Sequence, residues 1–147
     1  MKHYILCDID GTVADNQHRQ SLLKEYSDWN EFFRQMVKDK PLKKAVKLIE
    51  KEYQKGKKIF FLTGRPERFR KETEDWLKQN ISIENFKLIM REDDDHRNKV
   101  KVKKEMFNKN FSTEEIDCFL ENDDDLIALW RSLGIKVIDV KEINLSF

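Results

Sequence analysis

Five short apolar segments alternate with segments of helical periodicity, and this alternation restricts the fold more than any other feature of the chain. Each has the length of a β-strand, and the five are Tyr4–Cys7, Lys58–Leu62, Phe86–Met90, Ile116–Leu120 and Ile135–Val140. Nearly continuous hydrophobicity is typical of strands that are buried on both faces. Strands that alternate with helices join through right-handed crossovers into a parallel sheet covered by helices on both sides. The sequence therefore predicts an α/β fold with a doubly wound parallel sheet.

Apolar residues recur at helical spacing between the strands. The stripes consist of Trp29, Phe32, Phe33, Met36 and Val37, of Leu42, Ala45, Val46, Ile49 and Tyr53, of Phe69, Thr73, Trp76 and Leu77, and of Leu126, Ile127, Trp130 and Leu133. We interpret them as helix faces that pack in the core, the aromatic residues of the first stripe included. If the first of these helices forms a lid, one of its rings is also placed to stack on a base.

Residues 15–40 depart from strict alternation, because they add a helix before the one that leads to the second strand. We interpret them as a small helical insertion over the site, within one domain that comprises residues 1–147. Pro41 is expected in the first turn of the second helix, where its missing N–H is tolerated.

Composition alone indicates no particular partner. The chain has 29 Lys and Arg against 28 Asp and Glu, a formal net charge of +1, so its overall charge gives no argument for nucleic acid or membrane. No apolar run is long enough to span a bilayer, and Met1-Lys2-His3-Tyr4 leads directly into the first strand without a signal-peptide core. We therefore expect a cytoplasmic protein without membrane contact, in which Cys7 and Cys118 are buried free thiols.

The residues that carry chemistry stand where the strands end. In doubly wound sheets the ligand crevice lies beyond the carboxyl ends of the strands. A set of acids, a hydroxyl and a lysine is placed there: Asp8 and Asp10 after the first strand, Thr63, Gly64 and Arg65 after the second, Glu121 to Asp125 after the fourth, and Lys103 on the helix before the fourth. This set is typical of phosphoryl transfer through a nucleophilic carboxylate.

Each of these residue types has a role in such chemistry. Asp8 can attack phosphorus and become an aspartyl-phosphate, provided that Mg²⁺ and Lys103 offset the negative charge. Asp10 can protonate the leaving group and later take a proton from water. The Thr63 hydroxyl and the Gly64 N–H can hold phosphoryl oxygens at the start of a helix that Pro66 opens. No GxxxxGK[ST] loop is present, so the sequence does not indicate a nucleoside triphosphate site.

The motifs DIDGT and LTGR, with the downstream lysine and an acidic fourth segment, resemble the haloacid dehalogenase superfamily of aspartate-nucleophile phosphatases. Longer stretches, DIDGTVADNQHR, LTGRPERFRKETEDWL, LIMREDDDHRNKVKVKKEMF and LWRSLGIKVIDV, resemble the 3′-phosphatase domain of bacteriophage polynucleotide kinase/phosphatase. This resemblance covers nearly the whole chain. It implies a Rossmannoid fold, Mg²⁺ dependence and removal of 3′-phosphates from nucleic-acid ends. A separate kinase or ligase partner is then possible, because the kinase half is absent.

The resemblance also assigns roles to single residues. It implies that Asp8 is the nucleophile and Asp10 the acid/base, and that Thr63 and Lys103 complete the catalytic set. Arg19 and Arg65 would bind the substrate together with Gly64. The expected Mg²⁺ ligands are drawn from Asp8, Asp10, Glu121, Asn122 and Asp125.

Two positions depart from the family pattern. Glu121 and Asn122 stand where members usually carry paired aspartates, and Asp125, or Asp123 and Asp124 after a small shift, could restore the lost charge. Asp123 to Asp125 are equally well explained as the cap and first turn of a helix. Lys99 stands where relatives carry an acid.

Other functions fit parts of the pattern. One is a phosphatase of free nucleotides or other small phosphoesters, and another is a noncatalytic phosphate- or metal-binding module. A receiver-type domain is disfavoured, because its acceptor aspartate follows a middle strand whereas the third strand here ends in Met90-Arg91. Arg91 and Arg97 are interpreted as either surface salt-bridge partners or phosphate contacts, and Lys99 and Lys101 as solvated.

Overall fold

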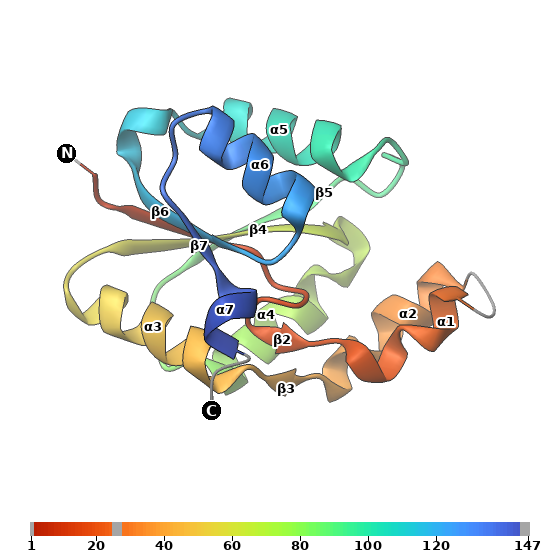
Figure 1. Cartoon of the computed structure of the whole chain (residues 1–147). Coiled ribbons are helices and arrows are strands. Elements are labelled where there is room, and N and C mark those ends of the chain that lie inside the picture. Colours follow the sequence, from red (N-terminus) through yellow and green to blue (C-terminus); the bar gives the residue numbers. More distant parts are fainter. Residues whose placement is uncertain (1, 25–27, 145–147) are drawn as a thin grey trace.

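The computed structural model describes residues 2–24 and 28–144 and contains a five-stranded parallel sheet with the order β5-β4-β1-β6-β7 (Figure 1). The strands are β1 (Tyr4–Cys7), β4 (Lys58–Pro66), β5 (Lys87–Arg91), β6 (Ile116–Glu121) and β7 (Val137–Asp139). β1 lies in the middle, and the chain extends the sheet first to one side of it and then to the other. The predicted α/β doubly wound fold is confirmed.

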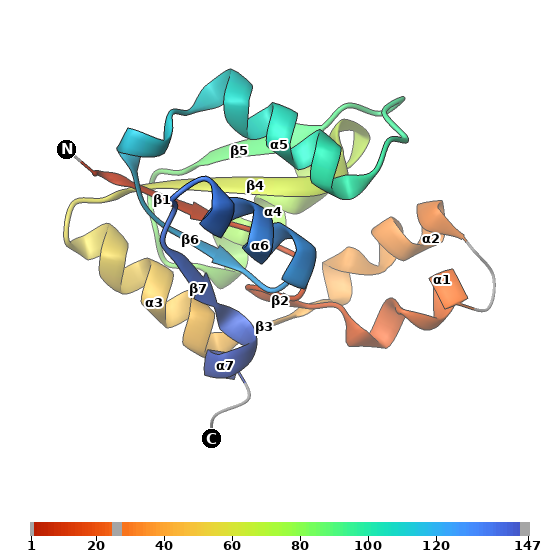
Figure 2. The same ribbon diagram turned by 45° about the horizontal axis from the view of Figure 1, so that its top comes forward.

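Helices cover both faces of the sheet (Figures 1 and 2). One face carries α3 (Lys43–Gln54), α4 (Arg70–Asn80) and α7 (Val140–Asn144), and the other carries α5 (Lys99–Asn110) and α6 (Asp124–Ser132). Ile5 and Cys7 pack toward α3 and α4, while Leu6 packs toward Phe107 of α5 and Trp130 of α6 on the other side. All three β1 residues are fully buried, as the continuous apolar run predicts.

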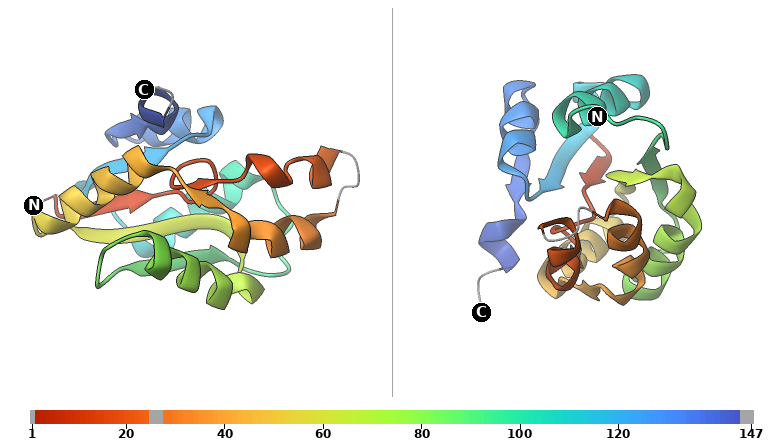
Figure 3. Two further views of the ribbon diagram at one scale, coloured as in Figure 1. Left: turned by 90° about the horizontal axis from the view of Figure 1, so that it is seen from below. Right: turned by 90° about the vertical axis from the view of Figure 1, so that its right-hand side faces the viewer.

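A helical segment joins β2 (Ala14–Asp15) to β3 (Lys40–Pro41) and projects beyond the carboxyl ends of the sheet strands (Figure 3). It contains the 3₁₀ turn η1 (Gln17–Arg19), α1 (Ser21–Lys24), α2 (Trp29–Arg34) and the 3₁₀ turn η2 (Gln35–Lys38). β2 and β3 pair antiparallel and close the base of the segment. Asp28 caps α2 by accepting a hydrogen bond from the Glu31 N–H over 3.0 Å.

Both prolines differ from their predicted positions. Pro41 lies in β3, and α3 begins two residues later, after Leu42, instead of enclosing Pro41 in its first turn. Pro66 is the last residue of β4, where the register with β5 shifts, and a 3₁₀ turn (η3, Glu67–Phe69) separates it from α4. A proline fixes its own φ and lacks an N–H, but it serves an irregular strand end as well as a helix start.

Two further boundaries move. The third predicted strand is shifted by one residue and ends at Arg91, and the fifth is restricted to Val137–Asp139. Val140, predicted in that strand, begins α7 instead.

The aromatic stripe of residues 29–37 is only partly buried, so its prediction as a core face is wrong at both ends. Phe32, Phe33 and Met36 form a small core of their own. Trp29 and Val37, by contrast, are 57% and 58% exposed. The reason is that α2 stands beyond the sheet, where α1, η2 and Phe69 of η3 pack on one side of it.

Both cysteines are free and buried. Burial raises the pKa of Cys118 to about 11 and that of Cys7 well above its ordinary value, so neither thiol is a reactive thiolate at neutral pH. Within residues 2–24 and 28–144, no helix combines the length and apolar character needed to cross a bilayer.

Candidate active site

Asp8 follows directly on β1, the strand at which the sheet changes direction of growth. Its backbone N–H donates to the Leu120 carbonyl of β6 over 3.0 Å, which ties the turn to the neighbouring strand. The side chain is buried, with Oδ1 accepting from Lys103 Nζ at 2.6 Å and Oδ2 accepting from Thr12 Oγ1 at 3.1 Å. The first predicted aspartate and the predicted lysine are therefore in direct contact at the switch point of the sheet.

Lys103 also contacts Glu121, the last residue of β6. Lys103 Nζ lies 3.5 Å from Glu121 Oε1, and the same oxygen accepts from Trp130 Nε1 at 3.3 Å. Glu121 Oε2 accepts from the Asn122 backbone N–H at 3.1 Å. Although Glu121 is completely buried, its oxygens all have partners.

The buried trio of Asp8, Glu121 and Lys103 holds two carboxylates and one ammonium group. Burial, followed by the Glu121 charge, raises the pKa of Asp8 to about 8 against the opposing effect of Lys103. Burial alone would lower the pKa of Lys103, but the two carboxylates raise it above its ordinary value. The trio therefore lacks one positive charge, which a proton or a cation can supply.

Asn122 lies against the other side of Asp8. The terminal amide atom that faces inward is 3.0 Å from Asp8 Oδ2, 3.1 Å from the Asp10 carbonyl oxygen and 3.2 Å from Thr12 Oγ1. These neighbours are satisfied when that atom is the amide nitrogen and donates to them. Gly11, with a φ of 79°, makes the approach possible, because a Cβ there would lie 2.3 Å from the other terminal atom of the Asn122 amide.

The same group of atoms fits a hard divalent cation. A carboxylate oxygen, a backbone carbonyl and an amide side chain are ligands that Mg²⁺ accepts, and the trio beside them needs positive charge. Among the described residues, no three His, Cys, Asp or Glu side chains form a cluster suited to a metal, so mixed oxygen donors are what this site offers.

Asp125 is not brought to this group. Its carboxylate is 76% exposed and lies 4.0 Å from Lys99 Nζ on the first turn of α6. Asp123 caps that helix by accepting from the Leu126 N–H at 3.1 Å, and Lys99 pairs with Asp123. The capping interpretation is thus confirmed for Asp123, and the turn that follows directs Asp125 outward.

Asp10 has a different charge environment from Asp8. Its Oδ1 accepts from Arg19 Nη2 at 2.5 Å and from Arg65 Nη2 at 2.7 Å, and its Oδ2 accepts from Arg65 Nε at 3.0 Å. Burial would raise the pKa of Asp10, but Arg65 and then Arg19 lower it to about 2. Asp10 is therefore a carboxylate in the unliganded protein.

Asp39 accepts hydrogen bonds from both Arg19 and Arg65, and it was not predicted as a site residue from the sequence. Asp39 Oδ1 and Oδ2 accept from Arg19 at 2.9 and 2.8 Å, and Oδ2 lies 3.4 Å from Arg65 Nη2. His18 Nε2 lies 2.6 Å from Asp39 Oδ1, and Trp76 Nε1 donates to the Asp39 carbonyl at 2.8 Å. Between two lysines in the sequence, Asp39 reads as a surface residue, so only the fold reveals it.

Arg19 and Arg65 are each 1% exposed, and most of their donors are used inside the protein. Beyond the two aspartates, Arg19 Nη1 donates to the Phe32 carbonyl at 3.1 Å and Arg65 Nη1 donates to Thr73 Oγ1 at 3.2 Å. Arg19 also lies over the Phe32 ring, with 4.3 Å between Cζ and the centroid. The structure thus places both predicted substrate-binding arginines around Asp10.

Thr63 and Gly64 lie inside β4 and not at a helix start, contrary to the prediction. Thr63 is buried, and its Oγ1 accepts from the Arg65 N–H at 3.1 Å. Gly64 faces open space, since a Cβ built on it meets nothing within 4 Å, and it lines a cleft of about 530 Å³.

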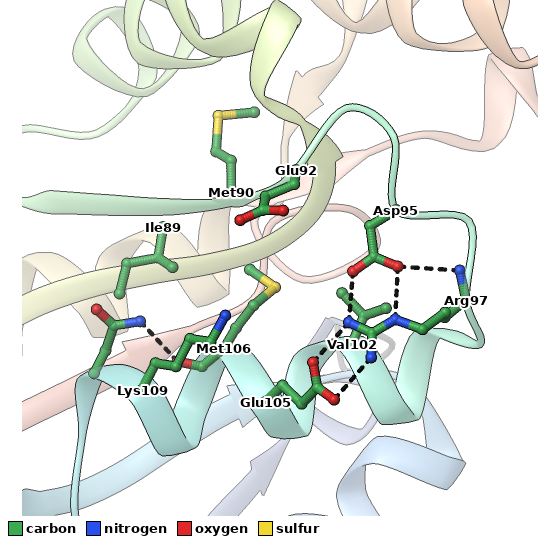
Figure 4. Close-up of a pocket in the computed structure, with 10 residues that line it drawn as sticks. Ile89, Met90, Glu92, Asp95, Arg97, Val102, Glu105, Met106 and Lys109 are labelled. Carbon is green, nitrogen blue, oxygen red and sulfur yellow. Dashed lines mark hydrogen bonds and ion pairs between the residues drawn. The ribbon is translucent and has the colours of Figure 1, made fainter.

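The loop before α5 is held by ion pairs. Arg97 pairs with Asp95 at 2.8 Å and with Glu105 at 2.6 Å beside a cavity of about 170 Å³ (Figure 4). Arg91 Nε donates to the Asp95 carbonyl at 2.7 Å. The surface salt-bridge interpretation is therefore confirmed for Arg97.

A parallel sheet of this order, with two aspartates after the central strand and a buried lysine in contact with the first, defines a haloacid dehalogenase-type phosphatase. Residues 2–145 match the family described as the polynucleotide kinase PNKP phosphatase domain, and the chain belongs to that family. The resemblance seen in the sequence motifs is confirmed.

Solved structures agree on the fold. Two chains from structures of the Pnkp1/Rnl/Hen1 complex are each 24% identical, with TM-scores of 0.75 and 0.77 over 95% and 93% of this chain. The matches cover 46% and 42% of those chains, so this chain spans less than half of their length. A candidate phosphatase from Clostridium difficile is 14% identical with a TM-score of 0.63, over 92% of this chain and 83% of its own. No curated protein matches the chain significantly.

Proposed function

We propose that the protein is a Mg²⁺-dependent phosphomonoesterase that works through an aspartyl-phosphate on Asp8 and removes 3′-phosphates from nucleic-acid ends. The observation that carries this proposal is the placement of Asp8 at the end of the central strand, 2.6 Å from a buried lysine and beside a group of oxygen donors. A carboxylate so placed can approach an anionic ester, because positive charge surrounds the reacting atoms.

In the first step, a bond forms between an Asp8 oxygen and phosphorus, and the bond from phosphorus to the substrate oxygen breaks. Lys103 stabilises the negative charge that the phosphoryl group brings into the buried trio. Asp8, the Asp10 carbonyl and the Asn122 side chain, with its amide turned so that the oxygen faces inward, would hold Mg²⁺, which would supply further positive charge to the transferring group. Glu121 keeps Lys103 charged and in position.

Asp10 moves the protons. It donates a proton to the departing alkoxide in the first step and takes one from the water that hydrolyses the aspartyl-phosphate in the second. Arg19 and Arg65 fix the direction of its carboxylate. Because they also hold it ionised in the unliganded protein, the proton must arrive with the substrate, whose anionic phosphoryl group raises the proton affinity of a neighbouring acid.

Membership of the PNKP phosphatase family supports a nucleic-acid end as substrate. Two structures similar in fold belong to a Pnkp1/Rnl/Hen1 complex, described as an RNA repair complex, which supports a separate kinase or ligase as a partner of this chain. The open cleft at Gly64 supports the same reading, because a polymer end needs an entrance that is not closed by a large cap.

The test is a comparison of substrates, metal and variants. A 3′-phosphorylated oligonucleotide and nucleoside monophosphates are incubated with Mg²⁺ or a chelator, and released phosphate is measured. We expect hydrolysis of the oligonucleotide, loss of activity with the chelator, and loss in Asp8→Asn but not in the surface control Asp117→Asn. Hydrolysis of monomers alone would reject end processing, and undiminished turnover by Asp8→Asn would reject the nucleophile.

A further inference from the structure

A cleft of about 530 Å³ opens beside the candidate active site. Its lining includes Trp29 and Phe33 of α2 and residues of the loop before α5. Figure 2 shows that α2 and this loop both lie beyond the carboxyl ends of the strands. Gly64 and Pro66 also line it. Gly64 stands between Thr63 and Arg65 in β4, and Arg65 donates to Asp10, so the cleft and the network around Asp10 share this segment of the chain.

Trp29 is unlike the other two tryptophans of the chain. Trp76 and Trp130 are 3% and 0% exposed, whereas Trp29 is 57% exposed. Its ring is anchored by Phe32 and Phe33, with centroids at 5.8 and 6.0 Å, so it is held in place as well as exposed. A fixed aromatic surface on the wall of a cleft is the kind of platform on which a planar ring stacks.

The charge of the cleft argues against a long polyanion as its occupant. Both basic and acidic side chains line it, and the charged residues are Arg68, Arg91, Arg97, Lys99, Glu92, Asp93 and Asp95. Arg97 and Lys99 are already paired with acids. Proteins that follow a nucleic-acid backbone need unpaired cations along its path. The aromatic wall therefore contributes more to binding than the charges do.

We propose that this cleft takes the nucleoside that carries the phosphate to be removed, with its base stacked on Trp29. The proposal rests on the proposed function and adds the way in which the substrate is recognised. A cleft of this volume accommodates one nucleoside, and Gly64 in its lining is next in the chain to Thr63 and Arg65 of the candidate active site. The enzyme then recognises the 3′-terminal nucleoside of a strand and not the rest of the strand on its 5′ side.

Binding is measured in the Asp8→Asn background, where no turnover occurs. A 3′-phosphorylated oligonucleotide is titrated and the dissociation constant is followed by polarisation of a label at its 5′ end, with ribose and deoxyribose ends in separate arms. Stacking of one base contributes about 1–3 kcal/mol, so adding Trp29→Ala should weaken binding about 5- to 150-fold. Trp29→Phe should retain most of the affinity. Val37→Ala, a similarly exposed residue of the same segment outside the cleft, should not change it.

An oligonucleotide whose terminal sugar lacks a base separates stacking from other contacts. Trp29→Ala should leave its already weak binding unchanged. In the otherwise native protein, Trp29→Ala should lower kcat/KM for the intact oligonucleotide by the same factor as the affinity, and should not alter hydrolysis of glycerol phosphate, which has no ring.

Equal affinity of the Trp29→Ala and parent proteins, or equal loss for the intact and the baseless ends, would overturn the stacking site. The two proposals fail separately. A native protein that binds the oligonucleotide through Trp29 but releases no phosphate would refute the proposed function and leave the stacking site standing. Turnover that Trp29→Ala leaves unchanged would refute the stacking site alone.

Discussion

Replacing Asp39 with asparagine should destabilise the protein strongly, although the residue is outside the sequence motifs. The Asp39 carboxylate and the guanidinium groups of Arg19 and Arg65 have no exposed side-chain area. Four charges form the network in the native protein: two arginines against Asp39 and Asp10. Asp39→Asn leaves two guanidinium groups with one carboxylate, and so one uncompensated positive charge in a buried position.

Breaking a buried ion pair by removing one partner typically costs about 3–5 kcal/mol. The free energy of unfolding of a domain is about 5–15 kcal/mol, so the change is a large part of the total. The hydrogen bond from Trp76 is made to the Asp39 carbonyl and persists in the variant, which limits the loss to the charge network. We therefore expect a loss of about 3–5 kcal/mol.

Urea unfolding followed by far-UV circular dichroism measures this loss. With an m value of about 2 kcal/mol/M, the midpoint should fall by about 2 M at an unchanged m. The matched control is Asp117→Asn, which removes a half-exposed partner 2.9 Å from Lys57 and should cost less than about 1 kcal/mol. If the midpoints of the two variants coincided, the buried network would not carry the energy that its geometry implies, and the reasoning would be refuted.

Three further predictions concern the charges at the site. Asp10→Asn should lower the free energy of unfolding by up to about 2 kcal/mol from the lowered carboxyl pKa alone. This contribution is complete above the ordinary pKa of 3.8 and is lost as the pH falls through about 2. The unfolding curves of the variant and the parent protein should therefore differ more at pH 6 than at pH 2.5. Mg²⁺ should raise the melting temperature more at pH 8 than at pH 6, since a proton on Asp8, whose pKa is about 8, competes with the cation; a shift that persists in Asp8→Ala would contradict this. Lys103→Met should lower kcat by about 100-fold or more, since it removes the only ammonium group beside Asp8 and Glu121 within the described structure, while the exposed neighbour change Lys104→Met should leave kcat within about twofold.

The parts of the site that could be predicted from the sequence are those that the sheet itself places. Asp8, Thr63 and Glu121 are near the carboxyl ends of β1, β4 and β6, and any parallel sheet with β1 between the other two brings these ends together. Lys103 is identified by its position in the motif, and α5 brings it across one face of the sheet to Asp8. Hydrophobic runs determine these positions, and they are visible in the sequence.

The remaining features depend on contacts between distant segments. Asp39 becomes buried because it meets Arg19, Arg65 and Trp76, which are 20 to 37 residues away in the sequence, and nothing local distinguishes it from a surface acid. Trp29 shows the opposite case. Its periodicity is that of a core residue, but its helix lies beyond the sheet, where no layer covers its outer face. Periodicity identifies which face of a helix is apolar, and only the tertiary structure determines whether another element covers it.

Asp8 and Asp10 differ by two positions in the sequence, but the fold places their side chains in separate charge environments. Asp8 faces Lys103 and a second carboxylate, a group that is short of one positive charge. Asp10 faces two arginines that share Asp39, a group that is electrically balanced and closed. A cation is therefore attracted to Asp8, whose group has a net negative charge, and not to the side chain of Asp10, whose group is neutral. The roles proposed for these two aspartates, nucleophile for Asp8 and proton carrier for Asp10, need such a separation, and the charges that set their ionisation come from different elements of the fold.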